Sequence, residues 1–174
     1  MAHEYNRPYN PDGVQAHLLS FRCYGTWLHG DTRGSVDRNG HNRWCTPNLP
    51  PDPRREQRER QSLTSPPITL SSAARHIVDV AVRRVCRHRG WILHALNVQH
   101  DHVHLVVTAH GKTPEEVMNS LKSWATRKLR ERKLMPVRGK VWSRHGSTKW
   151  LWTEDQVRRA CAYVIDGQPL PPGM

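Results

Sequence analysis

The sequence lacks three features that would place it in a common class of protein. It has no long apolar run, and its mean hydropathy is −0.77, so a membrane-spanning helix is not expected. Its four cysteines form no C-x-x-C pair, which argues against a thiolate zinc site or a redox motif. They are Cys23, Cys45, Cys86 and Cys161. No basic segment followed by an apolar stretch opens the chain, so we expect no secretory signal and a cytoplasmic protein with reduced cysteines.

Acidic residues are scarce beside basic ones. Fifteen Asp and Glu stand against 27 Lys and Arg, which gives a formal net charge of +12 over 174 residues. A chain of this length forms one domain of modest size. So much positive charge on a small domain indicates a polyanionic partner, with nucleic acid the first candidate. The alternative is a solvated basic surface without a partner.

The chain reads as one domain over residues 14–168, with a flexible tail at 1–13 and a short tail at 169–174. The segment 14–27 is rich in aliphatic and aromatic residues and predicts a first strand. Six of the thirteen prolines lie between residues 28 and 70, beside the charged run 54–60. We expect this insertion to be a basic flap without regular structure.

Regular patterning resumes after the insertion. Apolar residues at three- and four-residue spacing predict a helix over about 71–88, and strands are predicted over 91–99 and 102–108. A capping box at 113–116 opens a further helix. The helix is expected to bury Trp124.

The last part of the chain predicts strand and then helix. Residues 141–152 favour a hairpin or an irregular strand pair around His145. A second capping box begins at Thr153 and opens a helix that ends near residue 167. The element order predicts an α+β, ferredoxin-like (RRM-like) fold. In this fold a β-α-β-β-α-β antiparallel sheet has helices on one face and, here, an extra C-terminal helix.

His102 and His104 alternate along a predicted strand. Residues two apart on a strand point to the same face, so the two imidazoles project side by side. Such a pair can chelate one divalent cation if a third ligand comes from elsewhere. The alternative is a pair of half-exposed polar residues without a metal.

Tyr163 lies on the last predicted helix. At about 100° per residue it falls off the centre of the apolar stripe, with Asp166 one turn later on the same flank. We therefore expect its hydroxyl to reach a surface groove. The alternative is an ordinary boundary tyrosine with a buried ring and a solvated hydroxyl.

These residues together carry a family resemblance. The segment 99–107 (QHDHVHLVV) resembles the His-hydrophobic-His strand of the HUH single-strand endonucleases. With residues 121–124 (LKSW) on the next helix and Tyr163 on the last, the chain is most similar to the single-tyrosine transposases. These include insertion-sequence-200-like and REP-associated members. The resemblance covers about residues 14–168.

The resemblance implies a metal-dependent transposase that cuts and rejoins hairpin-bearing single-stranded DNA. Tyr163 would be the nucleophile and would form a 5′-phosphotyrosine intermediate with a free 3′-hydroxyl. His102 and His104 would bind the divalent metal, Mg or Mn. The resemblance also implies a homodimer and a bacterial, nucleoid-associated enzyme.

The third metal ligand departs from the family pattern. The family commonly supplies Asn or Gln four residues after the tyrosine, but that position is Gly167 here. Gln168 is favoured as the replacement, and Asp166 is the alternative.

Basic side chains outside this centre are candidates for contact with DNA phosphates. We expect an exposed basic face between Lys122 and Lys133, and at least two of Trp124, Trp142, Trp150 and Trp152 in the core. The candidates for nucleic-acid binding are Arg54, Arg55, Arg83, Arg87, Lys122, Arg127, Lys128, Arg144 and His145.

Two other functions fit parts of the sequence. One is a non-catalytic RRM-like module that binds single-stranded nucleic acid, although a single phenylalanine and the missing RNP pattern count against it. The other is a relative of relaxases or rolling-circle enzymes, whose tyrosines usually lie near the N-terminus, as Tyr5 and Tyr9 do here.

Overall fold

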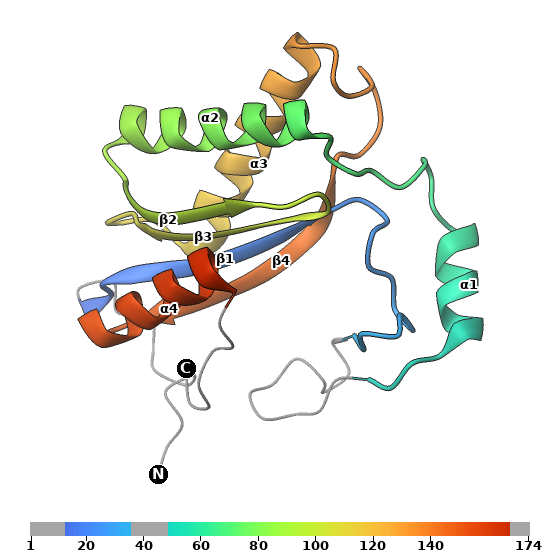
Figure 1. Ribbon diagram of the computed structural model, residues 1–174, viewed down its shortest axis with the longest axis horizontal. Coiled ribbons are helices and arrows are strands. Elements are labelled where there is room, and N and C mark those ends of the chain that lie inside the picture. Colours follow the sequence, from blue (N-terminus) through green and yellow to red (C-terminus); the bar gives the residue numbers. More distant parts are fainter. Residues whose placement is uncertain (1–12, 36–48, 168–174) are drawn as a thin grey trace.

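The computed structural model describes residues 13–35 and 49–167 (Figure 1). Four strands form one sheet in the order β2-β3-β1-β4, with every neighbouring pair antiparallel. The strands are β1 (Ala16–Cys23), β2 (Ile92–Val98), β3 (His102–Thr108) and β4 (Trp142–Leu151). The helices are α1 (Pro53–Gln61), α2 (Ser72–Arg89), α3 (Pro114–Glu131) and α4 (Glu154–Asp166).

The ferredoxin-like prediction is confirmed. The β1-α2-β2-β3-α3-β4 order and the strand arrangement are those of the expected α+β sheet, and α4 is the extra C-terminal helix. None of the described helices is long and apolar enough to cross a membrane. Cys23, Cys86 and Cys161 are free thiols, whereas Cys45 lies outside the described residues.

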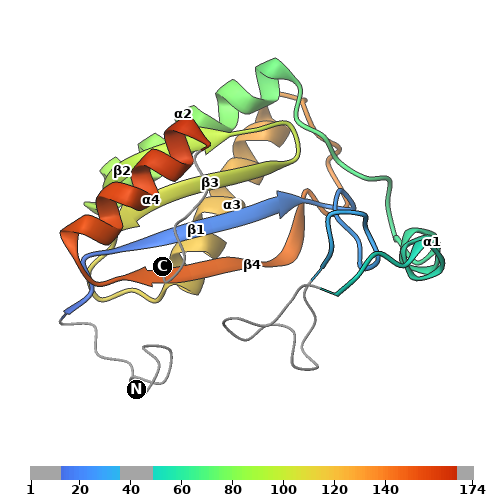
Figure 2. The same cartoon turned by 60° about the horizontal axis from the view of Figure 1, so that its bottom comes forward.

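Helices cover both faces of the sheet. Figures 1 and 2 show α2 and α3 on one face and α4 on the other. The period of two along β1 explains the division: Leu19 and Phe21 enter the larger apolar cluster under α2 and α3, whereas Ala16 and Leu18 enter a smaller cluster under α4. The sheet therefore has a thick core on one side and a thin one on the side of α4.

The helix starts follow the predicted caps. Ser71 accepts a hydrogen bond from the Ala74 amide at the start of α2, and Thr113 forms the full capping box with Glu116. At α4, Thr153 caps the helix, but the Gln156 side chain accepts from the Trp152 amide instead of closing the box.

The insertion differs from its prediction because it contains the helix α1. Asp52 caps this helix, Pro53 occupies its first turn, and Arg60 pairs with Glu56 at 2.6 Å. No residue of α1 is buried, so the helix has no apolar stripe from which periodicity can predict it.

Residues 142–151 form one continuous strand and not a hairpin. Glycine at position 146 does not mark a turn there. It allows close approach instead, since a Cβ at Gly146 would lie 2.5 Å from the Ser20 carbonyl oxygen and 2.6 Å from Met118 Sδ.

The expected exposure of Lys122 and burial of the tryptophans need correction. Lys122 is only 7% exposed, because its ammonium turns inward to the backbone of β4. Among the four tryptophans only Trp142 is buried, while Trp124, Trp150 and Trp152 are half-buried. Trp142 donates its indole N–H to the Lys122 carbonyl and to Thr126.

Candidate active site

His102 and His104 project from β3 toward the side of α4. Val103, between them, is fully buried in the opposite cluster, while both histidines are half-buried. Their ring centroids lie 4.6 Å apart. The side-by-side arrangement expected from the spacing is therefore present.

The Nδ1 atom of each imidazole is held by a neighbouring side chain. His102 Nδ1 donates to the Asp101 carboxylate at 2.6 Å, and His104 Nδ1 lies 2.5 Å from Ser20 Oγ. In the described part of the chain, no side chain or backbone group bonds Nε2 of either ring. A carboxylate on Nδ1 fixes the tautomer of His102 that leaves its Nε2 lone pair available to a cation.

Burial and nearby charges set the protonation states of His104 and of Asp101. Burial, with smaller contributions from the neighbouring His102 and Arg22, lowers the pKa of His104 to about 4, although the Asp101 carboxylate acts in the opposite direction. Burial raises the pKa of Asp101, but the hydrogen bond from His102 and the nearby cations outweigh it, so the net shift is downward. His104 is therefore neutral and Asp101 ionised at neutral pH.

Tyr163 meets this pair from α4. Its ring centroid lies 5.4 Å from that of His104, and its ring packs against the smaller apolar cluster. The helix is seated by the buried residues Ala160 and Val164, and Asn97 of β2 donates to the Val164 carbonyl at 2.9 Å. Tyr163 and the two histidines thus come together within one chain.

The third metal ligand is not assembled in the described residues. Asp166 is exposed in the last residue of α4, where Gly167 ends the helix. No three His, Cys, Asp or Glu side chains within residues 13–35 and 49–167 are grouped so as to hold a cation. Asp166 is therefore not brought to the histidine pair, and Gln168 lies outside the described residues.

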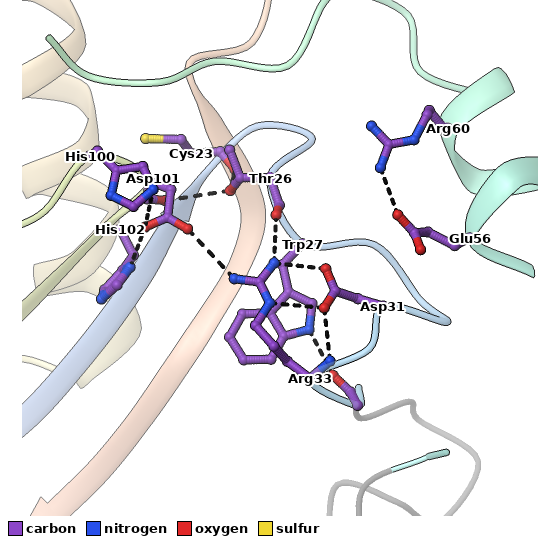
Figure 3. A network of polar contacts seen from close by, with 11 residues as sticks. Cys23, Thr26, Trp27, Asp31, Arg33, Glu56, Arg60, His100, Asp101 and His102 are labelled. Atoms are coloured by element: carbon purple, nitrogen blue, oxygen red, sulfur yellow. Dashed lines mark hydrogen bonds and ion pairs between the residues drawn. The ribbon is translucent and has the colours of Figure 1, made fainter. Parts of the chain in front are cut away.

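Arg22 and Asp101 are parts of the centre that sequence reasoning missed. Arg22 of β1 lies directly opposite His102 in the strand register. Asp101 is only 9% exposed and also receives an ion pair from Arg33 at 3.7 Å, as Figure 3 shows. Asp101 is next to His102 in the sequence, so its proximity can be read from the chain. No local sequence pattern, however, reveals which residue of β1 pairs with His102.

The expected DNA-contacting residues are distributed over several elements of the fold. Arg83 and Arg87 belong to α2, and Arg127 and Lys128 to α3, so they lie on the helices that cover the face away from the histidines. Arg83 pairs with Asp79, and both Arg127 and Lys128 pair with Glu131.

The remaining candidates lie nearer to the edges. Arg54 and Arg55 belong to α1, and Arg144 and His145 are exposed on the edge strand β4. Lys122 is buried and donates from Nζ to the Ser143 carbonyl at 2.9 Å. Its side chain is therefore not available to a DNA phosphate.

Comparison with known proteins gives a family and a fold. A family described as "Transposase IS200 like" matches residues 69–157, slightly more than half of the chain, including both histidines. No curated protein matches significantly.

Two solved structures resemble the chain. One is a REP-associated tyrosine transposase bound to a REP hairpin, with 13% identity and a TM-score of 0.52 over 92% of this chain and 69% of that one. The other is a candidate transposase from Deinococcus radiodurans R1, with 15% identity and a TM-score of 0.48 over 98% of this chain and 100% of that one.

Proposed function

The chain belongs to the family of IS200-like transposases, and on that premise we propose that it cleaves and rejoins single-stranded DNA with Tyr163 as the nucleophile. The observation that carries this proposal is the contact between Tyr163 and the histidine pair. A tyrosine whose ring lies 5.4 Å from His104 is positioned to act on a group bound at the two imidazoles.

The reaction is a transesterification at one phosphodiester. The phenolic oxygen of Tyr163 forms a bond to phosphorus, the bond from phosphorus to the 3′-oxygen breaks, and the phenolic proton is lost while the 3′-oxygen gains one. The products are a 5′-phosphotyrosine and a free 3′-hydroxyl. One phosphate ester replaces another, so a 3′-hydroxyl can reverse the step and join a strand without ATP.

A phenol with a pKa near 10 is a weak nucleophile at neutral pH and needs help from its surroundings. His102 and His104 would hold a divalent cation, Mg or Mn, through Nε2, and Gln168 remains our expected third ligand. When bound, such a cation supplies positive charge that stabilises a phosphate under attack. Asp101 and Ser20 orient the rings that would receive it.

We expect the substrate to be single-stranded DNA that carries a hairpin. The related REP-associated transposase was solved with a REP hairpin, and this chain shares its fold and carries a net charge of +12. The basic candidates Arg54, Arg55, Arg144 and His145 would contact backbone phosphates. Family membership also leads us to expect a homodimer.

Covalent capture tests the proposal. The purified protein is mixed with labelled single-stranded oligonucleotides that span the DNA flanking its own gene, and adducts are separated by denaturing gel. With Mg²⁺ or Mn²⁺ we expect a labelled protein band. Tyr163→Phe should abolish it, EDTA should remove it, and His102→Ala should lower its rate by about 100-fold.

Two outcomes contradict the proposal. An adduct that survives in Tyr163→Phe and disappears in Tyr5→Phe or Tyr9→Phe would assign the chemistry to an N-terminal tyrosine. Oligonucleotide binding that withstands both EDTA and His102→Ala, with no cleavage of any tested strand, would instead identify a non-catalytic binding module.

A further inference from the structure

Arg22 extends from β1 beside the candidate active site. It is directly opposite His102 in the antiparallel register, where facing side chains lie about 5 Å apart at Cβ. Residues two apart on a strand share a face, and Ser20 is hydrogen-bonded to His104. Arg22 therefore shares the face that carries both histidines.

An irregularity in the sheet occurs at Arg22. Between the pairs Phe21–Gly146 and Cys23–Trp142, β1 has only Arg22, whereas β4 has the three residues 143–145. Lys122 stabilises the distorted part of β4, since its Nζ donates to the carbonyls of Ser143 and His145. Bulges of this kind often lie next to active sites, where they redirect a side chain.

The guanidinium of Arg22 rests on an aromatic platform. Its Cζ lies over the Trp27 ring, 2.9 Å from the ring centroid, and Arg33 Cζ lies 4.3 Å from the same centroid. Arg33 is tied to the carboxylates of Asp31 and Asp101 and to the Thr26 carbonyl (Figure 3). Arg33 thus pairs with the nearby carboxylates. The Trp27 ring is held separately, since its indole N–H donates to the Gly34 carbonyl at 2.7 Å.

Arg22, unlike Arg33, is not paired with a carboxylate or a carbonyl of the described residues. Among residues 13–35 and 49–167, no hydrogen bond or ion pair involves its guanidinium, and the side chain is half-buried. Its electrostatic neighbours are Arg33, the carboxylates Asp101 and Asp31, and the hydroxyl of Tyr163 when ionised. A half-buried cation with free N–H donors beside the nucleophile is arranged to receive an anion.

We infer that Arg22 binds the non-bridging oxygens of the phosphodiester on which Tyr163 acts. This role rests on the proposed function. A guanidinium matches two phosphate oxygens with two parallel N–H donors, and stacking on Trp27 fixes the plane of the fork. The phosphate gains negative charge as the phenolic oxygen attacks, so a fixed cation favours the transition state over the ground state.

Binding of a minimal phosphodiester tests this role without any cleavage. The probe is the dinucleotide dTpdT, added in EDTA to protein labelled with ¹⁵N-arginine, so that a metal at the histidines cannot contribute. We expect the Arg22 Nε–Hε resonance, assigned by its loss in Arg22→Lys, to move on titration. Arg22→Gln should weaken binding by about tenfold.

Arg89→Gln is the matched control. Arg89 also lies over a tryptophan, Trp91, at 5.4 Å, but at the end of α2 on the other face of the sheet. Its replacement should leave dTpdT binding unchanged. Arg22→Lys keeps the charge without the fork and should bind with intermediate affinity.

The covalent capture assay provides a second, independent test of the role of Arg22. Arg22→Gln should slow adduct formation by about 100-fold, with Arg22→Lys recovering part of the rate. If the Arg22 resonance does not shift when dTpdT is added to the wild type, the inference is wrong, and no variant is needed to show it. Equal dTpdT affinities, or equal adduct rates, for wild type and folded Arg22→Gln would overturn it too. Absence of any wild-type adduct, with dTpdT bound through Arg22, would count against the proposed function alone.

Discussion

Lys122 carries an amine into the interior of the domain. Its side chain donates to two backbone carbonyls in the distorted part of β4. Burial lowers the pKa of Lys122 to about 8, because the charged form loses solvent. Lys122 is thus a structural residue of the α3–β4 contact.

The free energy of unfolding should depend on pH between 8 and 10.5 because of Lys122. In that range the unfolded lysine, with a pKa of 10.5, still holds a proton that the folded one has lost. The unfolded state then binds more protons, so the contribution of Lys122 to stability rises with pH, by up to about 1.4 kcal/mol per pH unit. Lys122→Met should be less stable than wild type by about 1–3 kcal/mol at neutral pH, and the gap should widen as pH rises.

Urea unfolding at several pH values measures that gap. Lys133→Met, at an exposed position after α3, controls for loss of a lysine as such. A gap between wild type and Lys122→Met that is the same at pH 7.5 and 10.5 would contradict the prediction.

Residues of the candidate site were predictable where one element determines their placement. The period of two brings His102 and His104 together, and the helical period puts Tyr163 on the flank of α4 that faces them. Arg22 depends on the pairing of β1 with β3, which are nearly eighty residues apart in the chain. The inward turn of Lys122 depends on acceptors in β4, which helical periodicity cannot reveal.

At the scale of elements, strong local signals predicted the core helices and strands, and weak ones failed. The caps at Ser71, Thr113 and Thr153 mark where α2, α3 and α4 begin. The helix α1 has caps but no apolar face, so its periodicity gave no sign of it. The sequence predicts a break in β4 because glycine is common in turns. Gly146 instead allows β1 of the sheet and Met118 of α3 to approach closely.

Gly146→Ala should destabilise the protein. The added methyl group would collide with the Ser20 carbonyl and with Met118 Sδ, so either β1 or α3 has to shift. Overpacking of this kind costs about 1–3 kcal/mol. The loss should appear as a lower midpoint of thermal unfolding.

Gly13→Ala provides the comparison for that measurement. A Cβ at Gly13 would lie 3.8 Å from the Trp152 ring, an ordinary van der Waals distance. Its midpoint should stay close to that of wild type. If both alanine variants have the same midpoint of thermal unfolding, the close contact at Gly146 does not affect stability and the prediction is wrong.

At the scale of the whole molecule, the sheet separates two surfaces. The α4 side carries the histidines, Tyr163 and Arg22, while α2 and α3 on the other side carry many paired basic residues. A groove on that other side, between α3 and the start of β4, is lined partly by Arg127, Arg130 and Lys140. Within the described residues, basic side chains therefore lie on several elements and not at one site.

Affinity for single-stranded DNA should fall steeply with salt. If about five phosphates are contacted, the logarithm of the binding constant should fall with that of the salt concentration with a slope near −3.5. Replacing Arg54 and Arg55 of α1 together by Gln should reduce the slope by about 1.4. Replacing Arg83 and Arg87 of α2 should change it less, because α2 covers the face away from the histidines.

Fluorescence anisotropy of a labelled oligonucleotide at four or five salt concentrations gives these slopes. A slope near zero for the wild type would show that the excess of basic residues does not serve DNA binding. Equal changes from the α1 and α2 pairs would show that DNA contacts α2 as well as α1.

The docking of α1 involves main chain and no buried side chain. The Asp52 amide donates to the Gly30 carbonyl at 3.0 Å, and a Cβ at Gly30 would collide with the Asp52 carbonyl and the Glu56 amide. Residue 30 is therefore constrained, while no side chain of α1 is buried. Over evolutionary time this helix can change the charges it presents without losing its position, so the contacts of the insertion can diversify while the arrangement of the histidines on the sheet is kept.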